Sequence, residues 1–304
     1  MQNSKHIFIS LVTSIMTLMT TTSCENLLNM DEADEKIVVE GWIDCGDYPI
    51  VMLSKNITLV DSMYNEEELL KYLVNDASVR VVCGNDTATL KGTININYFP
   101  PFTYTTKDMK GEAGKSYKLI VDTSDGLHHL EATTTVPKPV YLDSLCIEHI
   151  GSTDTLYQVR TFFRDNKDED NYYKIFVKTL NDTHADDEEG SYASMFRNNF
   201  LSSRISVFDD SILGDTTEFI VTRGFVNYAK DFQTYFIPND KLTIKFAQID
   251  RQSYIALKDI QHSVTFGGMV AINASRMIHT NVTGGLGTWI GYGASYYDVV
   301  IPGK

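Results

Sequence analysis

The sequence predicts a mainly β protein: an N-terminal immunoglobulin-like β-sandwich, followed by a second antiparallel β-rich domain with one or two short helices. From Ile37 onward, apolar and polar residues alternate in short runs, the pattern of half-buried strands. Turn residues at 84–86 and 124–126 separate pairs of such runs and indicate hairpins. Strands repeated at this spacing over about 100 residues are typical of a sandwich.

The first 23 residues have the order of a secretory signal peptide: a basic start, an apolar block over 7–19 and then small residues. The block is shorter than the roughly 20 apolar residues of a membrane-spanning helix. It leads to Cys24, placed as in a lipobox, although Thr21 stands where Leu is commoner. We expect cleavage before Cys24 and acylation of its thiol. Ordinary cleavage nearby is less favoured, because it would leave a lone thiol in an oxidising compartment.

Residues 24–35 are expected to form a lipid-anchored acidic tether. Positions 25–35 carry five acidic side chains among few apolar ones, too little apolar surface to drive ordering. In some Gram-negative lineages, acids just behind the lipidated cysteine mark export to the cell surface. The expected location is therefore the outer membrane, lipid-anchored and exposed at the cell surface.

The acidic balance of the chain excludes several partners. Its 304 residues carry a formal net charge of -14, with a pI near 4.9. No basic stripe is present to neutralise phosphates, which argues against nucleic acid. The same charge disfavours adhesion to anionic lipid, so attachment to the membrane is expected through the acyl chains alone.

The first predicted domain spans 36–137. Its runs IVVEGWID, PIVMLS, SVRVVC, TATLKGTI, SYKLIVD and HLEATTTV read as strands. Residues 65–74 interrupt them with a capping-box-like start at Asn65 and Glu68 and a helical apolar face, which predicts a short inserted helix.

Two prolines in VPKPV (136–140) cannot occupy a central strand, so a domain boundary is expected there. The second domain, 138–304, has five further strand-like runs, YQVRTFFRD, NYYKIFVKTL, SSRISVFD, TEFIVTRGF and KLTIKFAQID. Residues 251–264 show helical spacing, with Asp250 or Ser253 as the cap. A glycine-rich tail with interspersed aromatic residues follows. Each half has enough apolar strands to predict a core of its own.

The cysteines and histidines predict no metal centre. Cys45, Cys83 and Cys146 have no zinc-ligand spacing; Cys45 and Cys83 can pair only if their strands meet, and three buried thiols remain the alternative. His128 and His129 are neighbours on a predicted strand and point to opposite faces. A weak calcium candidate is the turn with Asp165, Asp168 and Asp170, although Lys167 lies inside it and the DxDxDG order is missing.

No motif for a catalytic residue or a cofactor is found. GxSxG, SxxK in its proper context, HExxH and the phosphate-loop signatures are missing from the sequence. A pair of carboxylates suited to glycoside hydrolysis stays open, because their separation depends on the fold.

Two aromatic stretches are candidate partner contacts. Phe99 and Phe102 flank the stiff Pro100-Pro101 pair, and rigid aromatic side chains on a loop suit a protein partner or a sugar ring. Trp289 and Tyr292 lie in the glycine-rich tail. In both stretches the alternative is that the rings pack into the protein.

Several features in order carry a family resemblance: the IVVEGWI opening, DASVRV, GKSYKLIV with EATTTVP, the RDNKDEDNYY turn, and the closing NASRMIHTNVTGGLGTWIGYG. The chain resembles the domain-of-unknown-function 4249 family, lipoproteins of Bacteroidota. The resemblance implies an accessory role beside a TonB-dependent outer-membrane receptor, a β-barrel, in nutrient uptake, and it supplies no catalytic residues.

The sequence therefore leaves three functions open. The first is a lipid-anchored accessory or binding protein without catalysis that works with such a transporter on a ligand that the sequence does not reveal. The alternative is a lipid-anchored hydrolase whose acid pair lies in the C-terminal domain. A surface adhesin is a weaker third possibility.

Overall fold

The computed structural model describes residues 35–56, 71–95, 98, 101–151, 155–180, 201–212, 217–222, 235–265 and 279–303. Residues Lys36–Lys304 form one compact unit, separate from Met1–Glu35. Cys24 and its tether lie outside the described residues, except for Glu35, and so do positions 65–70 of the helix expected at 65–74. The last residues of that segment are not helical, because Leu73 makes an isolated antiparallel bridge to Ser54.

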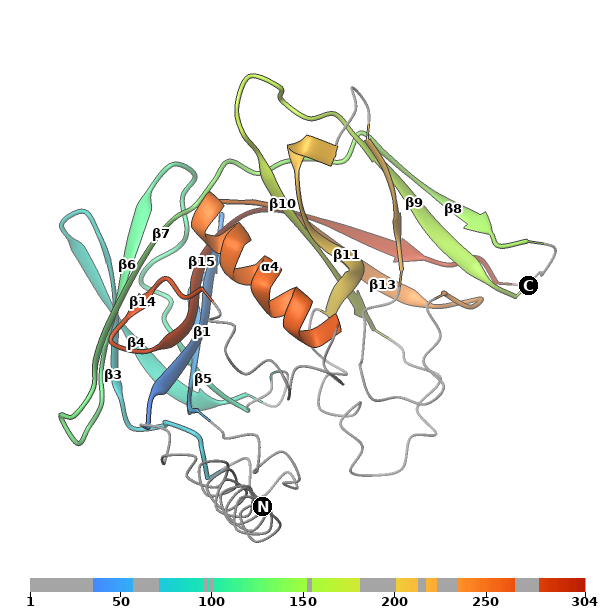
Figure 1. The fold of residues 1–304 in the computed structure, drawn as a ribbon. Coiled ribbons are helices and arrows are strands. Elements are labelled where there is room, and N and C mark those ends of the chain that lie inside the picture. Colours follow the sequence, from blue (N-terminus) through green and yellow to red (C-terminus); the bar gives the residue numbers. More distant parts are fainter. Residues whose placement is uncertain are drawn as a thin grey trace, which may run out of the picture. The chain divides into compact units, whose positions relative to one another are not determined.

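Most strands belong to one sheet of twelve, in the order β11-β10-β13-β15-β1-β2-β5-β4-β3-β6-β7-β14 (Figure 1). From the N-terminus the strands are β1 Ile37–Asp44, β2 Ile50–Lys55, β3 Ser78–Cys83, β4 Asp86–Ile94, β5 Phe102–Thr105, β6 Ser116–Asp122 and β7 His129–Thr135. The C-terminal part adds β10 Tyr172–Thr179, β11 Leu201–Asp209, β13 Lys241–Ile249, β14 Val282–Thr283 and β15 Leu286–Val300. A second sheet holds β12 Thr217–Val221, β9 Tyr157–Phe163 and β8 Ser144–His149. The mainly β fold with sandwich-like packing is confirmed.

The boundary expected between 137 and 138 does not divide this sheet. β15 pairs in parallel with β1, from Val38 opposite Leu286 to Asp44 opposite Tyr292, and antiparallel with β13 through its second half. β14 pairs with β7. This arrangement corrects the expected boundary, because strands from the end of the chain complete both the sheet and the core of the first half.

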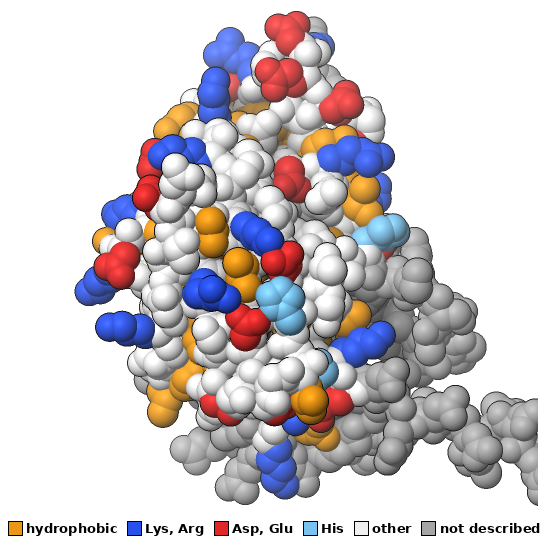
Figure 2. Space-filling view, turned by 90° about the vertical axis from the view of Figure 1, so that its left-hand side faces the viewer, with side chains coloured by type: hydrophobic (Ala, Val, Ile, Leu, Met, Phe, Trp, Pro, Cys, Tyr) orange, Lys and Arg blue, Asp and Glu red, His pale blue; other side chains and the backbone are white. Residues whose placement is uncertain are grey.

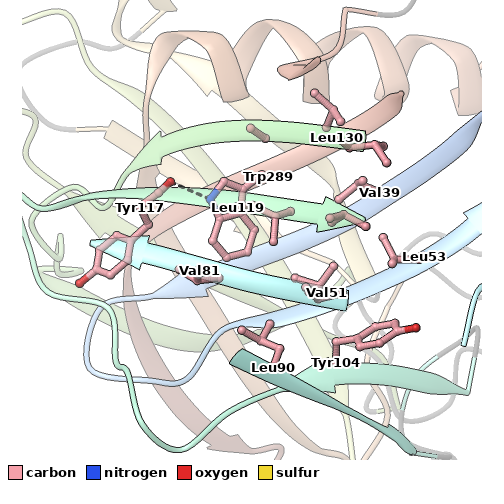
Figure 3. Close-up of a cluster of buried hydrophobic side chains, with 14 of the residues drawn as sticks. Val39, Val51, Leu53, Val81, Leu90, Tyr104, Tyr117, Leu119, Leu130 and Trp289 are labelled. Atoms are coloured by element: carbon pink, nitrogen blue, oxygen red, sulfur yellow. Dashed lines mark hydrogen bonds between the residues drawn. The ribbon is translucent and has the colours of Figure 1, made fainter. Parts of the chain in front are cut away.

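The first hydrophobic core depends on this sharing. Trp289 of β15 is fully buried among side chains of β1, β2, β3, β6 and β7 (Figure 3). Its indole Nε1 donates a hydrogen bond of 3.0 Å to the backbone oxygen of Tyr117, which satisfies the polar atom of a buried ring. Alternation along β1 places Ile37, Val39 and Ile43 on this same side.

Two further cores lie in the C-terminal part. One packs the three-stranded sheet against β10 and β13 and is rich in aromatic rings, such as Phe163, Tyr173 and Phe246. The other lies on the opposite side of β13 and β15, where Tyr254 and Leu257 of helix α4 (Arg251–Thr265) pack. Among the described helices, none is long and apolar enough to cross a membrane.

Helix α4 confirms the expected helix at 251–264. Asp250 is its cap: the Asp250 Oδ1 atom accepts a hydrogen bond from the backbone N–H of Ser253 at 2.7 Å. The other carboxylate oxygen of Asp250 accepts one from the hydroxyl of Thr134 on β7 at 3.1 Å. The helix start is thus bonded to a strand of the N-terminal part.

Candidate functional site

The four expected contact residues have different outcomes. Trp289 is 0% and Tyr292 5% exposed, so neither can contact a partner, and this expectation is wrong. Both lie on a central strand whose glycines let neighbouring backbone approach closely, as at Gly291 and Gly293. Phe102 is half-buried and packs edge-on against Tyr104, with 5.4 Å between ring centroids. Phe99 lies outside the described residues.

A buried ion pair occupies the side of the sheet opposite Trp289. Asp44, the last residue of β1, receives hydrogen bonds from the Lys245 Nζ atom of β13 at 2.8 and 2.7 Å. The Tyr296 hydroxyl of β15 also donates to Asp44. The ion-pair side chains are only 5% and 6% exposed, so water screens this charge pair little.

Aromatic rings surround the ammonium group of Lys245. Its Nζ atom lies 4.1 Å from the ring centroid of Tyr292 and 5.1 Å from that of Phe176 on β10. Rings at this distance attract a cation through their negative faces, most strongly where water is excluded. Burial nevertheless lowers the pKa of Lys245, and the carboxylate of Asp44 partly offsets this effect. Burial also raises the pKa of Tyr292, so this hydroxyl stays protonated.

A second lysine, Lys174 of β10, lies on the same side. It is buried, with its Nζ atom 4.6 Å from the Phe176 ring centroid. Burial and the positive charge of Lys245 lower its pKa to about 7, and Glu40 of β1 acts in the opposite direction. At neutral pH, therefore, both the charged and the neutral form of Lys174 are populated.

One side of the ion pair carries three aromatic side chains that keep some exposure. Tyr296 is 47% exposed, while Trp42 of β1 and Tyr98 of the β4–β5 connection are half-buried. The Trp42 and Tyr98 ring centroids are 5.8 Å apart. Burial raises the pKa of Tyr98, and the nearby carboxylate of Asp44 raises it further. We call Trp42, Tyr98 and Tyr296 the aromatic rim.

The geometry of the rim is suited to binding. Partly exposed Trp and Tyr rings offer large, rigid contact area with a polar atom at the edge. Both carboxylate oxygens of Asp44 already accept hydrogen bonds, so its bonds hold Tyr296 in place and leave little capacity for a ligand. The ion pair thus positions the rim.

The acidic turn between β9 and β10 is held together by protein contacts. Asp165 accepts a hydrogen bond from the hydroxyl of Tyr173, while Asp168 and Asp170 are exposed. Asn171 is buried, and its Nδ2 atom donates to the backbone oxygens of Asn166 and Glu169 at 2.7 and 2.9 Å. The three candidate calcium ligands are therefore not brought together. In the part of the chain that is described, no three His, Cys, Asp or Glu side chains are placed to hold a metal ion.

The outer face of β3, β6 and β7 carries interspersed charges of both signs (Figure 2). His129 is exposed and lies 2.6 Å from Asp122, which raises the pKa of the imidazole, while His128 is half-buried just before β7. Arg80 also bonds to Asp122, at 2.8 Å. Exposed pairs like these add little binding or folding energy. Cys45, Cys83 and Cys146 form no disulfide.

Comparison with known proteins identifies the family. Residues 25–296 match the family described as "Domain of unknown function (DUF4249)". The chain belongs to the DUF4249 family. No curated protein sequence matches this chain. Among solved structures, 22 chains match. One is the crystal structure of chicken CNTN1 FN1-FN3 domains, 11% identical over 87% of this chain and 66% of that chain, with a TM-score of 0.23. A TM-score this low supports no conclusion about fold or function.

Sequence reasoning missed most of this site in the DUF4249 chain, although two signals were present. Lys245 is the single charged residue inside the apolar run LTIKFAQI, and a lysine there either interrupts the strand or is buried with a partner. Trp42 and Asp44 are two positions apart on β1 and therefore share a face. The partner of Lys245, 201 residues earlier, could not be identified from the sequence.

Proposed function

We propose that this DUF4249 protein is a lipid-anchored accessory or binding protein of the outer membrane, exposed at the cell surface, which partners a TonB-dependent transporter in nutrient uptake and has no catalytic role. The order of residues 1–24 supports the lipid anchor, and the family resemblance supports the transporter. The first strand begins at Ile37, 13 positions after Cys24. A chain of that length spans at most about 45 Å, so the folded unit would stay close to the membrane.

The aromatic rim is the observation that carries the binding role. Its three rings come from β1, the β4–β5 connection and β15, and Tyr296 is fixed by its bond to the buried Asp44. Rings that are already held in place lose little conformational entropy on binding. Trp and Tyr are also the residue types most often found as binding hot spots. The rim replaces Trp289 and Tyr292 as the proposed contact surface.

The test measures recovery of a TonB-dependent receptor with the tagged protein from detergent-solubilised outer membranes. Trp42→Ala and Tyr98→Ala are expected to weaken recovery, by about 2 kcal/mol or more of binding if the ring is a hot spot. Tyr141→Ala is the matched control, because Tyr141 is 70% exposed and belongs to no described strand or helix. Thermal unfolding of each variant separates lost contact from lost folding. Equal recovery with the rim variants and the control would reject the rim as the contact surface.

The hydrolase alternative is distinguished in the same preparation. A stoichiometric β-barrel partner supports the accessory role. If no β-barrel is recovered and the purified protein turns over a glycan or peptide, the hydrolase replaces it.

The anchor has its own test. Cys24→Ala removes the thiol that would be acylated, so the protein should move from the membrane fraction to the soluble periplasmic fraction. The measurement is fractionation followed by detection of the chain, with Cys146→Ala as a control that should stay in the membrane fraction. Unchanged membrane association of the Cys24→Ala protein would mean that another feature attaches it.

A further inference from the structure

The three-stranded sheet ends in β8, Ser144–His149, an edge strand whose hydrogen-bonding direction is clear. The N–H of Ile150 donates to the backbone oxygen of Leu156 at 3.0 Å, and the same register continues through Cys146 opposite Arg160. In an antiparallel pair the bonded residues alternate along each strand. The even-numbered residues of β8 therefore bond to β9.

The backbone groups of Leu145, Ile147 and His149 consequently point away from β9. Within the described residues, nothing bonds to them. Proteins usually protect such an edge with a proline, a bulge or a charge directed along it. Positions 145–149 contain no proline and no register shift, and their one carboxylate, Glu148, is paired with Arg160 of β9, so the edge as described can accept another strand.

We propose that β8 pairs with β8 of a second copy of this chain, antiparallel, with the twofold axis at Cys146. In this register Leu145 lies opposite Ile147 of the second copy. Both side chains are on the half-buried face of β8, which packs on the aromatic-rich core between the three-stranded sheet and β10 and β13. Ser144 lies opposite Glu148 of the second copy, whose carboxylate already accepts hydrogen bonds from Arg160 and Gln158 of its own chain and can accept one more from the hydroxyl. The two leucine–isoleucine pairs would exchange about four backbone hydrogen bonds.

The chemistry of the strand selects this register. Only the odd-numbered residues of β8 offer free backbone groups, so every possible register pairs odd-numbered residues with each other. Neighbouring registers therefore differ by two in the sum of the paired residue numbers. The neighbouring register with its axis at Ile147 would place Leu145 opposite His149 and Cys146 opposite Glu148. It keeps one apolar pair, Ile147 with Ile147 of the second copy, in place of two leucine–isoleucine pairs, and it sets the carboxylate of Glu148 against the thiol of Cys146, so it is less favourable.

Cys146 gives a second reason for a like partner. With Cys24 used for lipid, three cysteines remain, and an odd thiol in an exported protein indicates intermolecular pairing or a free thiol. On the proposed axis the two Cys146 residues form a non-hydrogen-bonded pair, with Cα atoms about 4.5 Å apart. That separation lies inside the disulfide range of about 4.4–6.8 Å, so Cys146 can report the pairing.

The first test is cross-linking of the full-length protein in detergent. In the Cys45→Ser, Cys83→Ser protein, copper–phenanthroline should oxidise the two Cys146 thiols to one disulfide, giving a dimer that dithiothreitol reverses. Adding Cys146→Ser should abolish it. In that cysteine-substituted protein, Ser144→Cys together with Glu148→Cys should restore the dimer, and Ser144→Cys alone should not. Failure of both Cys146 and the Ser144→Cys, Glu148→Cys pair to cross-link would overturn the proposal.

The second test measures mass without oxidant, by light scattering on eluting protein. The wild type and Cys146→Ser should form dimers that dissociate on dilution. Cys146→Lys should be monomeric, because two ammonium groups would face each other on the axis. Thermal unfolding of the Cys146→Lys protein checks that it is folded. A wild type that is monomeric at every concentration, or a β8 cross-link to a different protein, would contradict pairing of like chains.

Discussion

At the scale of single residues, the two buried lysines differ in what they contribute. The Nζ atom of Lys245 is paired with the carboxylate of Asp44, and removing one member of a buried ion pair leaves the other charge unpaired. Lys174 is attracted by Glu40 but repelled by Lys245 and desolvated, and these opposing effects lower its pKa to about 7. One lysine is therefore required by its partner, whereas the other is costly when charged.

The pH dependence of stability should reveal Lys174. Its folded pKa of about 7 lies below the unfolded value near 10.4, so the unfolded chain binds more protons between these values. Stability should therefore rise as the pH rises from about 7 toward 10, and the charged form should cost several kcal/mol below that window, at about 1.4 kcal/mol per pKa unit. Above pH 10 the buried Tyr292 opposes this trend, since its raised pKa stabilises the fold only while the hydroxyl keeps its proton.

Substitution at Lys174 tests this. Lys174→Met should raise the unfolding free energy at pH 6 and flatten its rise between pH 7 and 10, measured by urea unfolding across that range. Lys91→Met, at an exposed lysine of β4, is the control and should leave the slope unchanged. Lys245→Met should instead lower stability by about 3–5 kcal/mol, because Asp44 would be buried without its cation. A Lys174→Met protein that keeps the wild-type slope would show that another group titrates.

At the scale of elements, alternating runs were predictable and exceptional strands were not. The GND and SDG hairpins and the strand at 37–44 follow from local alternation and turn residues, and the structure contains them. Local alternation predicts a glycine-rich tail in place of β15, because Gly287, Gly291 and Gly293 interrupt the pattern and glycine is disfavoured in strands. These glycines are required by contacts with residues far away in the sequence. At each of them a neighbouring backbone oxygen leaves no room for a side chain. The alternation pattern does not predict β5 or β8 either.

The candidate site was unpredictable for the same reason. Its members come from β1, β10, β13, β15 and the β4–β5 connection, and the register of the sheet brings the strand residues onto one side. Trp289 and Tyr292 are three positions apart on β15, so alternation points them to opposite faces, and both faces of this central strand are covered. Nothing in the local sequence distinguishes such a strand from an exposed aromatic loop.

Gly287 tests the pairing of β15 with β1. Its φ is +96°, and an added Cβ atom would lie 1.9 Å from the backbone oxygen of Val39. Gly287→Ala should therefore lose more than the roughly 1–3 kcal/mol of backbone strain alone. Gly46→Ala is the matched control, because Gly46 has a φ of +86° and open space around it, so only the strain applies. Thermal unfolding of both variants gives the comparison, and equal losses would mean that β15 can shift away from β1.

At the scale of the whole molecule, the prolines at 137 and 139 lie where the chain passes from β7 of the large sheet to β8 of the three-stranded sheet. They do not mark the border of an independent domain. The N-terminal part needs Trp289 and Val282 for its core and Lys245 for Asp44. The C-terminal part in turn receives β1 beside β15 and the Thr134 bond at the start of α4. Each part supplies what the other lacks, so the folded unit is expected to unfold in one transition.

Dividing the chain at 137 tests this interdependence. A fragment ending at Val136 would leave β1 unpaired on the side of β15 and open a space the size of Trp289, a loss of about 3–5 kcal/mol from the ring alone. It should show no cooperative thermal transition and should expose apolar surface to a fluorescent dye. Co-expressing residues 137–304 should restore a complex that purifies together, because β15 can again enter between β1 and β13. Trp289→Ala in the second fragment should prevent that recovery, whereas Tyr141→Ala should not. A cooperative transition in the first fragment alone would show that it folds independently and that a domain boundary does lie at 137.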